Sequence, residues 1–144
     1  MLKEILTEEM IQILPSVDTW EDAIKQGSEP LVSREFINAQ YVANMIDNVK
    51  ELGPYIVIAP DVAIAHARPK EDVFKVGLSL LKLDHGVPFS KDGHYASLIF
   101  VLAAVDNEQH LHLLSELAAV LKDSGKVNQM KQANSVKQIE QVIQ

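Results

Sequence analysis

The sequence contains no cysteine. The chain can therefore form no disulfide, offer no thiolate nucleophile and hold no thiolate-bound metal. It also has no apolar run near the roughly 20 residues that cross a bilayer, and its first residues lack the apolar core of a signal peptide. We therefore expect a cytoplasmic protein with no direct membrane insertion.

Basic residues are sparse as well. Lys and Arg number 13 against 20 Asp and Glu, which gives a formal net charge of -7 and no basic cluster. Affinity for a phosphate backbone comes mainly from clustered Lys and Arg. The composition therefore argues against a nucleic-acid partner.

No repeat, low-complexity tract or Gly-, Pro- or Ser-rich linker divides the 144 residues, of which 47% are hydrophobic. Such a chain can bury roughly 70% of its unfolded surface in one core without a disulfide or structural metal. We expect a single domain over residues 1–144. Apolar runs bounded by turn residues predict strands over 10–14, 55–58, 76–81 and 97–102.

Helical spacing and capping pairs predict the helices. One begins at Thr19 and ends near Gly27, a second follows from Pro30, and a third covers residues 41–49 and stops at Gly53. A long helix follows Asp106, and a short one follows Ser135 at the carboxyl end. Together these elements predict an α/β fold, in which helices cover a mixed β-sheet whose strand order the sequence does not reveal.

Five histidines are the candidates for chemistry near neutral pH. His85 and His94 lie in polar segments expected to be loops, where an exposed histidine is usually only solvated. His112 falls on the polar face of its predicted helix, because two positions along a helix turn a side chain by roughly 200°. We expect no functional role for these three residues.

His110 lies in the first turn of the predicted long helix, on the apolar face that must pack against the sheet. Backbone N–H groups and the dipole at a helix head favour an anion, so His110 could help to hold a phosphate. The alternative is a partly buried histidine bonded to a nearby carbonyl. On helix position alone, this alternative is the simpler interpretation.

His66 has an alanine on each side, which leaves its ring sterically open. If this segment is extended, His66 and Arg68 point the same way, and the guanidinium could flank a phosphoryl group on the imidazole. The alternative is a strand-end histidine beside an Arg68 paired with Glu71 or Asp72.

Other chemistries lack their motifs: the chain has no HExxH, no GxSxG and no Gly-rich phosphate loop, and the HxH of residues 110–112 splays across a helix.

Three segments, residues 53–60, 63–69 and 106–111, resemble the enzyme IIA components of the bacterial phosphoenolpyruvate-dependent sugar phosphotransferase system. The match is to the mannitol/fructose superfamily, and Gly53-Pro54-Tyr55 is most similar to the ascorbate and related pentitol branch. The resemblance covers essentially the whole chain, with the three motifs in the expected order and spacing. It implies a mixed sheet flanked by helices on both faces.

The resemblance also implies a phosphotransferase with a phosphohistidine intermediate and no metal or other cofactor. His66 is then the phosphorylated residue, which receives its phosphoryl group from the phosphocarrier protein HPr and passes it to a cysteine of the cognate enzyme IIB. His110 is the second active-site histidine and stabilises the phosphoryl group. The sugar, L-ascorbate or a pentitol, is taken up by the membrane enzyme IIC permease and never meets this domain.

The chain departs from the family pattern at two places. Alanines flank His66 where the family has proline and glycine, and Asp47-Asn48-Val49 lies where the mannitol branch carries an active-site arginine. We expect Arg68 to supply the positive charge instead. Two other functions stay open: a regulatory module of the same fold, whose phosphorylation state controls a transcription factor or enzyme, and a structural adaptor with incidental histidines.

Overall fold

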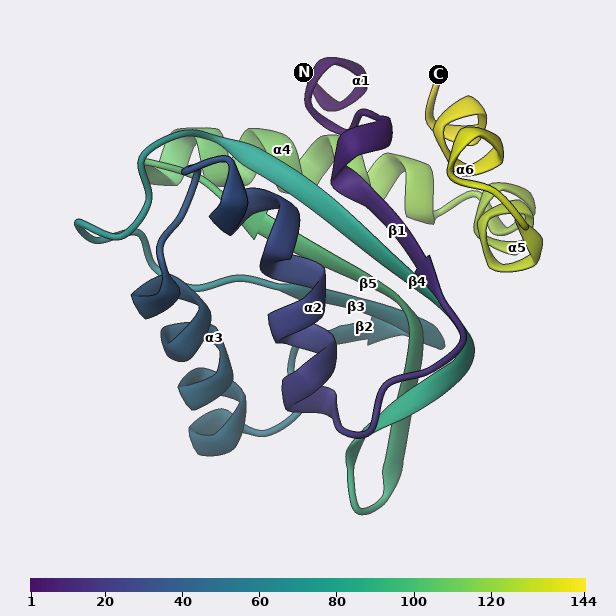
Figure 1. The fold of residues 1–144 in the computed structure, drawn as a ribbon, viewed down its shortest axis with the longest axis horizontal. Coiled ribbons are helices and arrows are strands. Elements are labelled where there is room, and N and C mark those ends of the chain that lie inside the picture. Colours follow the sequence, from purple (N-terminus) through teal and green to yellow (C-terminus); the bar gives the residue numbers. More distant parts are fainter.

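A five-stranded sheet lies at the centre of the computed structural model, which describes residues 1–144 (Figure 1). The strand order is β1-β4-β5-β3-β2. β1 runs parallel to β4 and β3 runs parallel to β5, whereas the β4–β5 and β2–β3 pairs are antiparallel. The strands are β1 (Ile11–Leu14), β2 (Val57–Ala59), β3 (Asp61–Ala65), β4 (Gly77–Ser90) and β5 (Gly93–Ala103).

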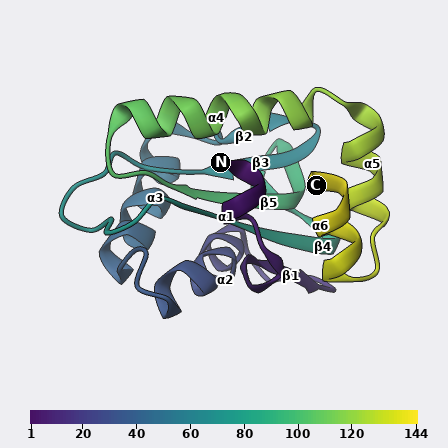
Figure 2. The same cartoon turned by 90° about the horizontal axis from the view of Figure 1, so that it is seen from above.

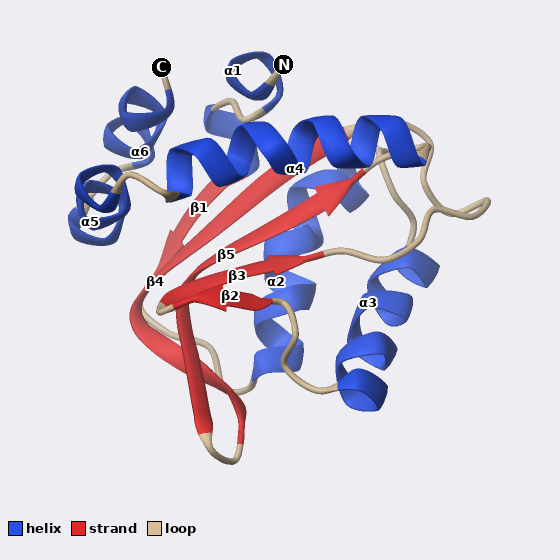
Figure 3. Ribbon diagram, turned by 180° about the vertical axis from the view of Figure 1, so that it is seen from behind, coloured by secondary structure: helices blue, strands red, loops and turns tan.

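Helices cover both faces of this sheet (Figures 2 and 3). One face carries α2 (Trp20–Ser33) and α3 (Ala39–Leu52). The opposite face carries α4 (Asn107–Leu121), α5 (Ser124–Gln132), α6 (Val136–Ile143) and the short α1 (Leu2–Ile5), while the 3-10 turn η1 (Glu8–Met10) leads into β1. A core of 39 buried hydrophobic side chains fills the layers. The predicted α/β architecture is confirmed. None of the helices combines the length and the hydrophobicity that a membrane span requires.

The predicted break between two helices near Gly27 is wrong, because α2 runs through both Gly27 and Pro30. Pro30 has no N–H to donate to the Gln26 carbonyl one turn earlier. The Gln12 side chain on β1 donates to that carbonyl instead, at 2.8 Å. Gly27 serves close packing on the sheet, since a Cβ there would lie 3.3 Å from a methyl group of Val101.

The second error concerns the β4–β5 hairpin, where the polar segments around residues 84–86 and 91–93 are predicted as loops. β4 continues to Ser90, and its pairing with β5 leaves only a tight turn at 91–92. Phe89 points inward and packs against Trp20, with ring centroids 6.0 Å apart. Gly86 and Pro88 resemble turn residues in the sequence and hide this alternation. Helix α5 was also not predicted as a separate element; it begins after the N-cap Asp123.

Candidate active site

The topology brings the two candidate histidines to one edge of the sheet. β3 and β5 are parallel neighbours, so their carboxyl ends lie at the same edge (Figure 3). His66 directly follows β3, and the chain leaving β5 enters α4, whose first turn carries His110. The two imidazole rings lie with centroids 5.2 Å apart and planes tilted by 50°. The sequence named both residues, and the structure places them together.

The tautomer of His66 follows from its backbone contact. Its Nδ1 lies 2.9 Å from the carbonyl oxygen of Ile64. A carbonyl can only accept a hydrogen bond, so Nδ1 carries the proton and donates it. In the neutral ring, Nε2 then keeps its lone pair. The half-buried His66 therefore has a nucleophilic nitrogen that is not engaged by the protein.

His110 is half-buried beside His66. Burial lowers the pKa of His110, and the charge of a protonated His66 lowers it further. The ring is therefore held neutral more strongly than an exposed histidine. Two side-chain bonds fix the head of its helix. The Gln109 N–H donates to the Asp106 carboxylate at 2.8 Å, as the capping pattern predicts, and the Val105 N–H, one residue before the N-cap, donates to the Gln109 side chain at 3.2 Å.

Tyr55 completes the surroundings of His66, and in the sequence it stands out only as part of a family motif. Its ring meets the His66 ring edge-on, with centroids 5.7 Å apart. Burial raises the pKa of the Tyr55 phenol, against a smaller opposing effect of a hydrogen bond with the Asn48 side chain. The residue is 40% exposed, so it forms part of the rim of the site. No spacing rule in the sequence identifies such a contact.

Arg68 lies on the α3 side of this rim. β3 ends at Ala65, so residues 66–68 lie beyond the strand. The exposed Arg68 makes no ion pair with Glu71 or Asp72. It lines a cavity of about 300 Å³ together with Asn44, Asp47, Asn48, Leu52, Ala67 and Lys70. Asn48 therefore lies in the wall of this cavity, next to the rim that Tyr55 forms around His66.

The other three histidines lie apart from the site. His85 and His94 are exposed on the β4–β5 hairpin, where His94 Nδ1 lies 2.7 Å from Ser90 Oγ. His112 is exposed on α4, 3.9 Å from Glu116, on the polar face that the helical spacing predicts. No group of three or more His, Asp or Glu side chains is arranged to hold a metal ion.

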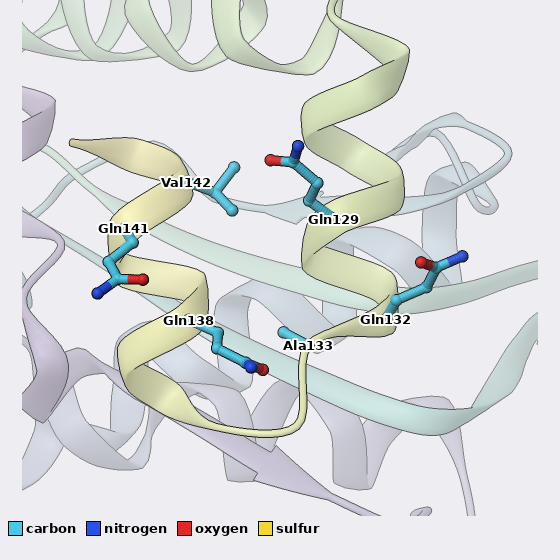
Figure 4. A pocket seen from close by; sticks show the side chains of 6 residues that line it. All are labelled: Gln129, Gln132, Ala133, Gln138, Gln141 and Val142. Carbon is cyan, nitrogen blue, oxygen red and sulfur yellow. The ribbon is translucent and has the colours of Figure 1, made fainter.

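A separate cavity of about 380 Å³ lies between α5 and α6 (Figure 4). Its walls are amides and two apolar side chains, without an acid, a base or a nucleophile: Gln129, Gln132, Ala133, Gln138, Gln141 and Val142. This cavity therefore offers no side chain for proton or phosphoryl transfer.

Comparison with known proteins identifies the family. Residues 4–144 match the family model described as phosphoenolpyruvate-dependent sugar phosphotransferase system, EIIA 2. The chain belongs to this family. Phosphoryl transfer is accordingly the class of chemistry in which this enzyme IIA takes part. The histidine pair is the arrangement in the structure that suits such chemistry.

Individual relatives are similar over most of their length. The mannitol-specific cryptic phosphotransferase enzyme IIA component of Escherichia coli is 30% identical over 142 residues, which is 99% of this chain and 97% of that protein, and its solution structure superposes with a TM-score of 0.91. The ascorbate-specific EIIA component of Escherichia coli is 35% identical over 111 residues, covering 76% of this chain and 72% of that protein.

A complex is also among the similar structures. Mannitol enzyme IIA of Escherichia coli, solved with phosphorylated enzyme IIB, is 26% identical, covers 96% of each chain and has a TM-score of 0.83. A domain of this fold therefore meets an enzyme IIB as its partner.

Proposed function

We propose that this enzyme IIA is a cytoplasmic phosphoryl carrier in sugar uptake, and that Nε2 of His66 is the atom that carries the phosphoryl group. The observation behind the proposal is the bond from His66 Nδ1 to the Ile64 carbonyl, which leaves Nε2 as the free nucleophile beside His110. The donor is the phosphohistidine of HPr, and the acceptor is a cysteine of the cognate enzyme IIB.

Both steps are in-line displacements at phosphorus. In the first, the Nε2 lone pair of His66 forms the new N–P bond while the N–P bond of the donor breaks and its imidazole leaves. In the second, the acceptor thiolate forms an S–P bond and His66 leaves. Such transition states are loose, so the protein contributes mainly position and electrostatic stabilisation. The fixed His66 tautomer removes the need to rearrange the ring before attack.

His110 serves as a partner whose proton affinity changes with the phosphoryl group. Before transfer, burial and His66 hold its pKa low. A phosphoryl dianion on His66, with ring centroids 5.2 Å apart, raises the pKa of His110 again, because an opposite charge favours the protonated form. The ring can then donate a hydrogen bond to a phosphoryl oxygen. Arg68 adds positive charge from the exposed rim, where it is not neutralised by an ion pair.

The sugar we propose is L-ascorbate or a pentitol, which is taken up by the membrane enzyme IIC and receives the phosphoryl group through enzyme IIB. The Gly53-Pro54-Tyr55 block supports this choice, because it is most similar to the ascorbate and pentitol branch and its Tyr55 packs against the His66 ring. The ascorbate-specific relatives support it as well, whereas the cryptic mannitol relative leaves a hexitol as the competing substrate class.

The test is a reconstituted relay. Phosphoenolpyruvate, enzyme I and HPr are mixed with the wild-type chain, and intact mass is followed for one acid-labile phosphoryl group. His66→Gln should accept none. His110→Gln should accept the group but pass it slowly to purified enzyme IIB.

His112→Gln is the matched control, because it removes an exposed imidazole from the same helix. It should behave as the wild type in both steps. Phosphorylation of His66→Gln at the wild-type rate would overturn the assignment. Acceptance by the wild type, followed by transfer to neither the ascorbate nor the mannitol type of enzyme IIB, would instead favour the regulatory alternative.

A further inference from the structure

One buried hydroxyl group joins the two chain segments that carry the histidines. Tyr41 lies on α3 with 1% of its surface exposed, and its ring belongs to the hydrophobic core. Its oxygen accepts a hydrogen bond from the Ala67 N–H at 3.1 Å and donates one to the Leu102 carbonyl at 2.7 Å. Ala67 directly follows His66, and Leu102 is the penultimate residue of β5.

The position of this hydroxyl explains how β3 and β5 separate at the end of their pairing, next to the candidate site. The β3–β5 ladder ends at the pair Ala65–Val101. Beyond that pair, the Ala67 N–H and the Leu102 carbonyl are bridged through Tyr41 Oη rather than bonded to each other. An oxygen inserted between donor and acceptor holds the two strands further apart than a direct bond would.

The place where Tyr41 separates the two strands lies next to the histidines. His66 is on one side of the bridge, and on the other side only a short connection separates Leu102 from α4 and His110. The Ala67 carbonyl also lies 3.3 Å from the hydroxyl, but the hydroxyl has one proton and the shorter bond is to Leu102. Burial raises the pKa of Tyr41 to about 12, so the hydroxyl stays protonated and can donate at any physiological pH.

We propose that Tyr41 is a positioning residue of the phosphoryl-transfer site. It acts through the backbone of Ala67 and Leu102 and sets the distance and angle between His66 and His110. This inference rests on the proposed function, because it assigns a role to Tyr41 in that same reaction.

The test compares Tyr41→Phe with Ser79→Ala. Both substitutions remove one buried hydroxyl that donates to a backbone carbonyl; Ser79 Oγ donates to Gly27 at 2.6 Å, between β4 and α2. Single-turnover transfer from the phosphorylated chain to enzyme IIB is measured with saturating partner. We expect Tyr41→Phe to be roughly 10- to 100-fold slower than the wild type, the usual effect of a small misplacement of reacting groups. Ser79→Ala should keep the wild-type rate.

A second readout does not need catalysis. Nitrogen NMR of the imidazoles reports the tautomer of His66, and Tyr41→Phe should shift these signals and those of His110, while Ser79→Ala leaves them in place. Unchanged histidine signals and equal transfer rates for the two variants would overturn the inference. If the wild type accepts no phosphoryl group, the proposed function fails, and the NMR comparison still decides whether Tyr41 sets the histidine geometry.

The wild type provides a measurement that remains if Tyr41→Phe does not fold. The Ala67 amide lies outside the strand ladder, so its hydrogen bond is the one to Tyr41 Oη, in a buried position. We expect slow hydrogen exchange at Ala67. Exchange at the rate of an unprotected amide would refute the bridge.

Discussion

The continuity of α2 depends on one side-chain bond from outside the helix. Pro30 leaves the Gln26 carbonyl without its helical donor, and Gln12 Nε2 donates to it at 2.8 Å. Gln12→Met keeps the length of the side chain and removes this donor. The Gln26 side chain, which now donates to Gln12 at 2.7 Å, is half-buried and can turn to water. The main loss is therefore one unsatisfied carbonyl.

An unsatisfied buried acceptor costs about 1–3 kcal/mol. Because Gln26 is half-buried, we expect Gln12→Met to lower the free energy of unfolding by about 1–2 kcal/mol, the lower part of this range. This corresponds to a fall in melting temperature of about 3–8 °C. Urea unfolding followed by fluorescence measures the change, since Trp20 is the single tryptophan and begins α2. Far-UV circular dichroism should give the same midpoint if unfolding is two-state.

Measuring Gln12→Met in a Pro30→Ala chain tests whether the cost comes from the missing backbone donor. This substitution restores a backbone N–H in register with the Gln26 carbonyl, so Gln12→Met should then cost less than about 0.5 kcal/mol. The difference between the two backgrounds is the coupling of Gln12 to the missing donor. Equal costs in both backgrounds would refute the reasoning and leave Gln12 as an ordinary surface contact.

Three further outcomes are expected. The pKa of His110 is lowered in the folded protein, so protonation of this residue opposes folding. The stability that neutral His110 contributes is therefore complete above about pH 6.5 and is lost as the pH falls through the lowered pKa. In an NMR titration, His66→Gln should raise the pKa of His110, and an unchanged pKa would contradict the coupling. Tyr55→Leu should slow acceptance by His66 about 2- to 10-fold and Tyr55→Phe should not, because the contact is made by the ring; equal rates would exclude this role. Lys82 holds the pKa of the Asp84 carboxyl below its usual range. Their ion pair therefore stabilises the fold above about pH 4, and this stabilisation is lost as the pH falls through the lowered pKa. The free energy of unfolding in urea should lack this pH dependence in Asp84→Asn.

The helix caps show what local sequence predicts well. Thr19, Asp106 and Ser135 each accept a bond from the N–H three residues later, as their capping patterns predict. These bonds form within one turn and depend on no other element. Gly27 and Pro30 were misread for the opposite reason. Their compensating contacts come from β1 and from the sheet beneath α2, which no local pattern reveals.

The candidate site likewise has a part that the sequence predicts and a part that it does not. His66 and His110 could be named because their residue types and motifs carry information, but their contact required a strand order that the sequence does not contain. Tyr41 is the first residue of the helix predicted over residues 41–49, and the structure buries its ring in the core. Its hydroxyl bonds to residues 26 and 61 positions away and has no sequence signal of its own.

The strand directions also decide which histidines can act together. β3 and β5 are parallel, so both end at the edge where His66 and His110 meet. β4 is antiparallel to β5, so its carboxyl end lies at the other end of the sheet, near His94, whereas His85 lies opposite residues 96–98 of β5. At about 3.4 Å per residue, the 11 residues of β5 separate these two edges by on the order of 30 Å. The phosphoryl group that we propose on His66 is therefore out of reach of the hairpin histidines, and we expect a partner that takes it to approach the edge formed by His66, His110 and Tyr55.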